Sequence, residues 1–158
     1  MNTLQIGPHV LALAIAFALA VPIGWDREQR ARSAGLRTFP LVALAACGFI
    51  QASEQMLANS PDGMAKVIEG LITGIGFIGG GAILKQGNSV QGTATAASLW
   101  ATGAIGVAVG LGSYDVAVTI AVFTFLTLKL LSLVKDEEDE DKEGKAEGEK
   151  GRKKPDNS

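Results

Sequence analysis

Five apolar stretches, each about as long as a lipid bilayer is thick, dominate this sequence. A helix needs roughly 20 apolar residues to cross a hydrocarbon core of about 30 Å. Short polar or turn-forming segments separate the stretches, as expected where a chain leaves the bilayer and re-enters it. We therefore predict an all-α fold, a polytopic bundle with about five transmembrane spans: Leu4–Ile23, Phe39–Met56, Val67–Leu84, Thr93–Leu111 and Val116–Val134.

The charges are concentrated at the end of the chain. Lys135–Ser158 holds ten of the 16 acidic residues and seven of the 14 basic ones. The part before it, residues 1–134, is then too poor in charge for a typical soluble domain. We predict a transmembrane domain over residues 1–134 and a disordered, charged cytoplasmic tail over residues 135–158, because the tail cannot bury enough apolar surface to fold. The tail either keeps the chain soluble or makes an electrostatic contact with a partner or anionic lipid.

The orientation follows from the basic residues in the loops. Cytoplasmic loops of membrane proteins carry an excess of Lys and Arg. The connection between the first two spans is rich in arginine, which places it in the cytoplasm, and alternation along the chain then places the N-terminus outside and the C-terminus inside. The arginines are Arg27, Arg30, Arg32 and Arg37.

Small residues are concentrated in the third and fourth spans. Helices in lipid associate by close packing, which small side chains permit. We therefore predict that these two spans form the tightly packed centre of the bundle, through Gly70, Gly74, Gly76, Gly80, Gly106 and Gly110. The run Gly79-Gly80-Gly81 has a second interpretation, a broken helix of the kind that forms ion sites in transporters.

Several polar residues lie within the apolar spans. Charge inside a membrane is costly and is usually functional. Glu69 lies about one turn into the third span, and it either pairs with Lys66 at the membrane edge or takes part in ion binding or proton relay. The candidate intramembrane polar site comprises Glu69, Thr73, Thr95, Ser98 and Thr102.

The connection after the first span is the candidate functional loop. Asp26 with Arg30, and Glu28 with Arg32, have the spacing of ion pairs on one helix face. Thr38 is the expected N-cap of the second span, and Arg37 lies where a specific pairing at the mouth of the bundle is expected. The loop's candidate residues are Asp26, Arg27, Glu28, Arg37 and Thr38.

Residues typical of catalysis or of metal binding are scarce. The chain has one histidine, His9, and one cysteine, Cys47. No Cys, His and Asp cluster has metal-ligand spacing, and no serine has the setting of a hydrolase nucleophile. We predict no enzymatic activity, no metal site, no cofactor and no nucleic-acid partner.

Four motifs resemble the MgtC/SapB family. They are Gly24-Trp25-Asp26-Arg27-Glu28, Ala34-Gly35-Leu36-Arg37-Thr38, Thr73 to Phe77, and Thr95 to Thr102. The resemblance covers roughly Leu11 to Leu133. The chain departs from the family's pattern at Asp26, which is usually Glu, at Ser33, which is usually Pro, at Phe39, which is often His, and at Lys66 and Gly70, which are commonly Arg and Gln.

The resemblance implies a multi-pass protein of the bacterial inner membrane, linked to growth in low magnesium and, in pathogens, to survival inside host cells. It implies a regulator that acts on other membrane proteins, notably the ATP synthase. A carrier or channel for an ion or small solute is the alternative. The expected partners are the lipid bilayer and other membrane proteins, and a homo-oligomer is compatible with the sequence.

Overall fold

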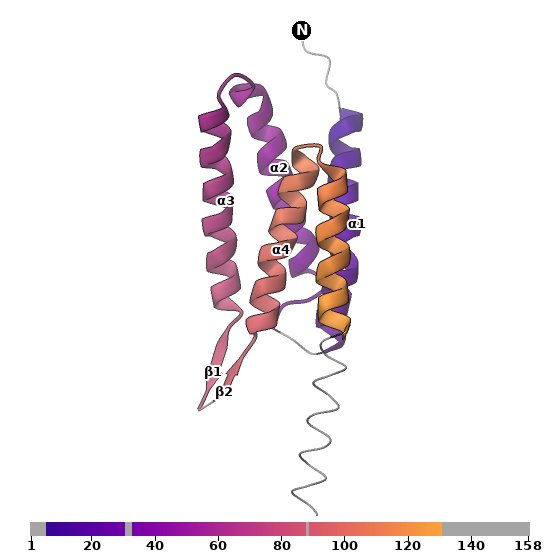
Figure 1. Ribbon diagram of the computed structural model, residues 1–158, viewed down its shortest axis with the longest axis vertical. Helices are drawn as coiled ribbons and strands as arrows, with labels where there is room; N and C mark the ends of the chain where they lie inside the picture. Colours follow the sequence, from indigo (N-terminus) through magenta and orange to yellow (C-terminus); the bar gives the residue numbers. More distant parts are fainter. Residues whose placement is uncertain (1–5, 31–32, 88, 131–158) are drawn as a thin grey trace, which may run out of the picture.

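The computed structural model describes residues 6–30, 33–87 and 89–130. These residues form five helices and one short hairpin, which confirms the predicted all-α, membrane-type fold (Figure 1). The predicted tail, residues 135–158, lies outside the described residues. The elements are α1 (Ile6–Gln29), α2 (Thr38–Leu57), α3 (Pro61–Gly81), β1 (Leu84–Gln86), β2 (Ser89–Gln91), α4 (Thr93–Gly110) and a last helix over residues 114–130.

Among the described residues, three helices are both long enough and apolar enough to cross a membrane: α1, α3 and α4. Helix α2 carries a shorter apolar segment, Thr38–Glu54. The helices run side by side along the long axis of the molecule, as membrane spans do (Figure 1). The five apolar stretches of the sequence therefore predicted the approximate positions of the five helices.

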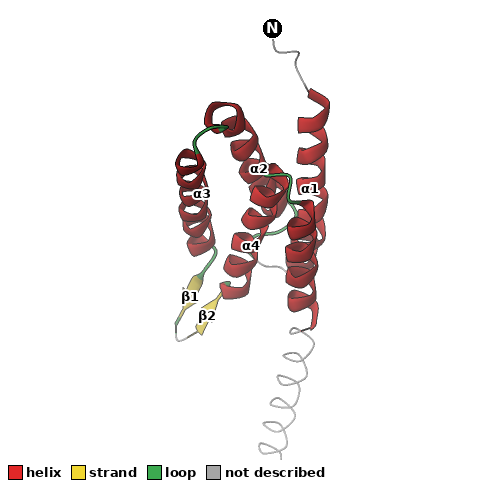
Figure 2. Ribbon diagram, turned by 45° about the horizontal axis from the view of Figure 1, so that its top comes forward, coloured by secondary structure: helices red, strands yellow, loops and turns green. Residues whose placement is uncertain are grey.

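Among α1 to α4, helices α2 and α4 form the most extensive contact, and α1 packs against both. Alanines at four-residue spacing on α1, Ala12, Ala16 and Ala20, are buried in the core. Ala117, Ala121 and Leu128 of the last helix join the same core. Helix α3 lies at the edge of the bundle, beside α2 and α4 (Figures 1 and 2).

The contact between α2 and α4 depends on two glycines of α4. A Cβ atom at Gly106 would lie 2.8 Å from the Cβ of Ala46, and one at Gly110 would lie 2.7 Å from the Cβ of Ile50. Both positions lack room for any side chain. Glycine therefore permits the close approach of these helices.

The glycines of α3 are placed differently from the prediction. Gly70, Gly74, Gly76 and Gly80 are exposed, and a Cβ atom at any of them would have no neighbour within 4 Å. Helix α3 instead touches α4 through Ile75, beside Gly103, and through Gly79, beside Ala96. The centre of the bundle is therefore the α2–α4 contact and not a pairing of the third and fourth spans, because α3 presents most of its glycines away from α4.

The glycine run at the end of α3 does not break the helix. The helix continues through Gly79 and Gly80 to Gly81, where it ends. An antiparallel hairpin follows, in which Leu84 pairs with Gln91 and Gln86 with Ser89. The sequence predicts only a short polar or turn-forming connection there, although a two-residue connection beginning with Gly is a hairpin signal.

The start of α2 also differs from the prediction. The N-cap position is occupied by Arg37, without a side-chain cap hydrogen bond, and Thr38 is already helical. The backbone N–H groups of Thr38 and Phe39 donate to the carbonyl oxygen of Gly35, at 3.0 and 3.2 Å. Backbone bonds from the preceding turn thus replace the predicted threonine cap.

Candidate functional site

A buried carboxylate surrounded by cations lies at the end of the bundle where the hairpin lies. The last turns of α1 place Asp26 in the core, only 1% exposed, with Arg27 beside it and also buried. Arg27 Nε donates to Asp26 Oδ2 at 3.0 Å, and Arg27 Nη2 contacts the same oxygen. Arg30 Nε donates to Oδ1 at 3.4 Å, and Lys129 Nζ lies 3.5 Å from Oδ1. We call these four residues the Asp26 cluster.

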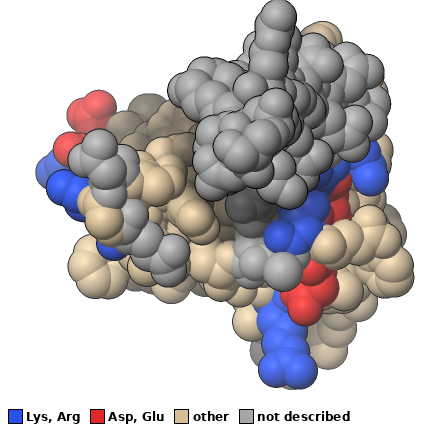
Figure 3. Space-filling view, turned by 90° about the horizontal axis from the view of Figure 1, so that it is seen from below, with Lys and Arg blue, Asp and Glu red and all other residues tan. Residues whose placement is uncertain are grey.

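The Asp26 cluster joins the first helix to the last one. Burying a carboxylate is costly unless it is paired and hydrogen-bonded, and here both oxygens have cationic partners. The Asp26–Arg30 pair was predicted from its four-residue spacing. Lys129 was not predicted as a site residue, although a lone lysine within an apolar span is a signal that such a partner exists. Figure 3 shows basic and acidic side chains side by side at this end of the molecule.

Glu28 shapes the connection between α1 and α2. Its Oε2 accepts a hydrogen bond from the backbone N–H of Leu36 at 3.1 Å. A Cβ atom at Gly35 would collide with the Glu28 carboxylate, so a side chain there would displace that carboxylate from this position. Ser33 Oγ donates to the carbonyl oxygen of Ala82 at 3.1 Å, which ties the connection to the end of α3. The predicted partner of Glu28, Arg32, lies outside the described residues.

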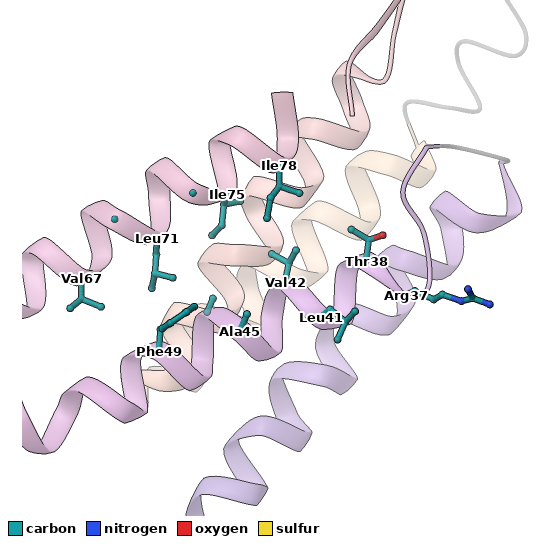
Figure 4. Close-up of a pocket in the computed structure, with 13 residues that line it drawn as sticks. Arg37, Thr38, Leu41, Val42, Ala45, Phe49, Val67, Leu71, Ile75 and Ile78 are labelled. Carbon is teal, nitrogen blue, oxygen red and sulfur yellow. The ribbon is translucent and has the colours of Figure 1, made fainter. Parts of the chain in front are cut away.

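An apolar groove of about 610 Å³ separates α2 from α3. We call it the α2–α3 groove. Its lining is almost entirely aliphatic and aromatic apart from Arg37 and Thr38 at one end (Figure 4). Arg37 is exposed, and its side chain extends away from the groove (Figure 4). The lining also includes Leu41, Val42, Ala45, Phe49, Val67, Gly70, Leu71, Gly74, Ile75 and Ile78.

The predicted intramembrane polar residues fall into two separate groups. Glu69 and Thr73 are exposed on α3, whereas Thr95, Ser98 and Thr102 are buried on α4. Three of the hydroxyls donate within their own helix: Thr73 to the Glu69 carbonyl at 3.0 Å, Ser98 to that of Thr95 at 3.0 Å, and Thr102 to that of Ser98 at 2.8 Å. The fold therefore does not gather these residues into one polar site. Within residues 6–30, 33–87 and 89–130, no three His, Cys, Asp or Glu residues lie together as metal ligands would.

Comparison with known proteins gives a consistent match. Residues 13–137 match the MgtC family. The chain is 41% identical to Protein MgtC of Salmonella typhimurium strain LT2 over 115 residues, which are 73% of this chain and 48% of that protein. It is 42% identical to Protein MgtC of Brucella abortus strain 2308 over 111 residues, 70% of this chain and 46% of that protein. An uncharacterized protein of Synechocystis is 41% identical over 109 residues, 69% of this chain and 46% of that protein.

The chain spans about half the length of these curated relatives. In this chain the residues that match the family, 13–137, include α2, α3, α4 and most of α1. No solved structure matches the chain.

Proposed function

The chain belongs to the MgtC family, and from this premise we propose that it is a non-enzymatic regulator of other membrane proteins that supports growth when magnesium is scarce. In this proposal it lies in the bacterial inner membrane, with its N-terminus outside and its C-terminus in the cytoplasm. It acts by binding a transmembrane helix of a partner protein in the α2–α3 groove.

The α2–α3 groove is the observation that carries the proposal. Leu41 and Phe49 of α2 are 62% and 59% exposed, and they face a groove that opens to the surroundings of the bundle. Gly70 and Gly74 form part of the opposite wall, where the absence of side chains permits another backbone to approach closely. A long apolar groove between two helices suits an apolar helix as its occupant.

The placement of the polar residues favours a binding protein over a carrier. A carrier for ions typically brings ionisable groups to the interior of its bundle. Here Glu69 is exposed on the edge helix, and the Asp26 cluster, on α1 and the last helix, is internally paired. The buried hydroxyls of Ser98 and Thr102 are engaged by carbonyl groups of their own helix.

The test fills the groove without disturbing the core. Ala45 lines the groove and is exposed, so Ala45→Leu adds bulk to the groove alone. We expect a strain that depends on this chain to lose growth in low magnesium when it carries Ala45→Leu, with protein abundance unchanged. Partners cross-linked in native membranes should be lost in parallel. Gly74→Leu fills the groove from the opposite wall and should have the same effect.

The matched control is Ala14→Leu, at an exposed alanine of α1 away from the groove, which should behave as the wild type. Normal growth and normal cross-linking with both groove variants would contradict the proposal. Flux of magnesium, potassium or protons through the purified chain in liposomes would favour the carrier instead.

A further inference from the structure

Helix α3 has a second uncovered surface, on a different side from the α2–α3 groove. It consists of Lys66, Glu69, Thr73, Gly76, Phe77 and Gly80, all of which are exposed. Their spacing of three, four and seven residues places them on one helix face. We call this surface the open face of α3.

We propose that the open face of α3 joins two copies of this chain into a symmetric dimer, with Lys66 of each copy pairing with Glu69 of the other. This inference goes beyond the proposed function, since it concerns a separate surface and a defined partner.

The backbone of α3 is accessible along this face. A Cβ atom at Gly76 or Gly80 would have no neighbour within 4 Å, and the ring of Phe77 is 86% exposed. The opposite side of the same helix is already used, because Ile75 and Gly79 pack against α4. Two glycines four residues apart on an apolar helix permit close helix–helix contact in lipid.

Glu69 gives a separate reason for a partner on this face. It lies two residues inside the predicted third span, which begins at Val67, or about 3 Å along the helix axis. Helix α3 is long and apolar enough to cross a membrane, so the carboxylate faces the region that lipid would occupy. An exposed carboxylate inside a span is costly unless another group pairs with it. Among the described residues, neither Glu69 nor Lys66 forms a salt bridge through its side chain.

The open face of α3 also carries a cation, Lys66, whose charge complements that of the Glu69 carboxylate. Lys66 and Glu69 lie three residues apart, about 4.5 Å along the axis. In a two-fold symmetric contact, residue i of one copy meets residue j of the other, and the reverse contact forms as well. Two copies in the same membrane orientation have their α3 helices parallel, which places each Lys66 beside the partner's Glu69. A single surface thus supplies both members of two ion pairs, and this self-complementarity identifies a second copy as the occupant.

The test exchanges the charges on the full chain in lipid nanodiscs or mild detergent, with the mass measured by light scattering or native mass spectrometry. We expect the wild type to dimerise, and Lys66→Glu or Glu69→Lys alone to weaken the dimer at least tenfold. The double exchange, Lys66→Glu with Glu69→Lys, should restore it. Restoration distinguishes a pairing between copies from damage to the fold.

An uncharged variant tests the same contact independently. Gly76→Leu fits within one chain, since no atom lies near, but it would obstruct a second α3 and should yield monomers with an unchanged Tm. Gly7→Leu, at a comparably open glycine of α1, is the control and should leave the dimer intact. A monomeric wild type, a dimer that survives Gly76→Leu, or a double exchange that stays monomeric would each overturn the inference. Ala45→Leu should dimerise normally, so failure of the dimer and failure of the proposed function can be told apart.

Discussion

At the scale of single residues, the polar side chains of this protein have two kinds of environment. Asp26 and Arg27 are buried and paired to each other, whereas Arg37 and Glu69 are exposed. All four stood out in the sequence for the same reason, since charge is rare in the first 134 residues. Their separate roles become visible only when burial and partners are known.

Asp26 is expected to be essential for stability. Removing one member of a buried ion pair typically costs about 3–5 kcal/mol, because the remaining charge is left without compensation. Asp26→Asn should therefore lower the free energy of unfolding by about 3–5 kcal/mol, measured by thermal or denaturant unfolding in detergent. Lys129→Met should cost less, because the Lys129 side chain is 44% exposed. The control Glu54→Gln, at an exposed carboxylate of α2, should change it by no more than about 0.5 kcal/mol. An Asp26→Asn protein as stable as the wild type would contradict the structural role of the cluster.

Arg37 is expected to matter for function rather than for folding. It is exposed and occupies the N-cap of α2, where a positive charge is unfavourable by about 0.3–1 kcal/mol because of the helix dipole. Arg37→Ala should therefore keep the Tm and the abundance of the wild type. We expect growth in low magnesium to be lost, because Arg37 is exposed at one end of the α2–α3 groove, where a partner would contact it. Lys85→Ala, at an exposed cation of the hairpin, is the control and should grow normally. Full growth of the Arg37→Ala strain would show that the residue is dispensable.

At the scale of elements, each helix has one face committed to the bundle, and the faces differ in what they permit. Helix α4 places Gly106 and Gly110 against α2, whereas α3 places most of its glycines outward. Equal spacing of small residues in two spans thus serves two different purposes. The spacing of apolar residues along a helix predicts that one face of the helix is buried, but it does not predict which element covers that face.

The glycines of α3 and α4 should respond in opposite ways to the same substitution. Gly106→Ala brings a Cβ atom within 2.8 Å of Ala46, which is closer than real side chains approach, so α2 and α4 must separate. We expect a loss of stability of about 1–3 kcal/mol, the usual cost of overpacking. Gly70→Ala meets no atom within 4 Å and should be neutral, or more stable by up to about 1 kcal/mol, because alanine favours the helix. Equal Tm values for the two variants would contradict the packing described for α4.

At the scale of the whole molecule, the bundle is closed on one side and open on the other. Helices α1, α2, α4 and the last helix share the core, and the Asp26 cluster links α1 to the last helix. Helix α3 is attached at the edge of the bundle (Figure 2). The α2–α3 groove lies on one side of it and its open face on another. The surfaces proposed to bind partners therefore both involve the helix that contributes least to the core.

The predicted orientation and the predicted tail can be tested on the full chain. A periplasm-specific reporter fused after the last residue should be inactive and a cytoplasm-specific one active, as the arginine-rich first connection requires.

Truncation after Lys135 should leave abundance and growth in low magnesium unchanged if the tail only keeps the chain soluble. A truncated chain that is abundant but inactive would instead indicate an electrostatic contact made by the tail.

The sequence by itself determined the class of fold, the number and approximate limits of the helices, and the family. It could do so because apolar length and local spacing are properties of neighbouring residues, which the bilayer and the helix constrain directly. The tertiary structure alone decided that Lys129 meets Asp26, that α2 rather than α3 is the main partner of α4, and that Glu69 lies apart from Thr95, Ser98 and Thr102. Each of these depends on how the helices are rotated and ordered around one another, and that arrangement is set by contacts between residues far apart in the chain.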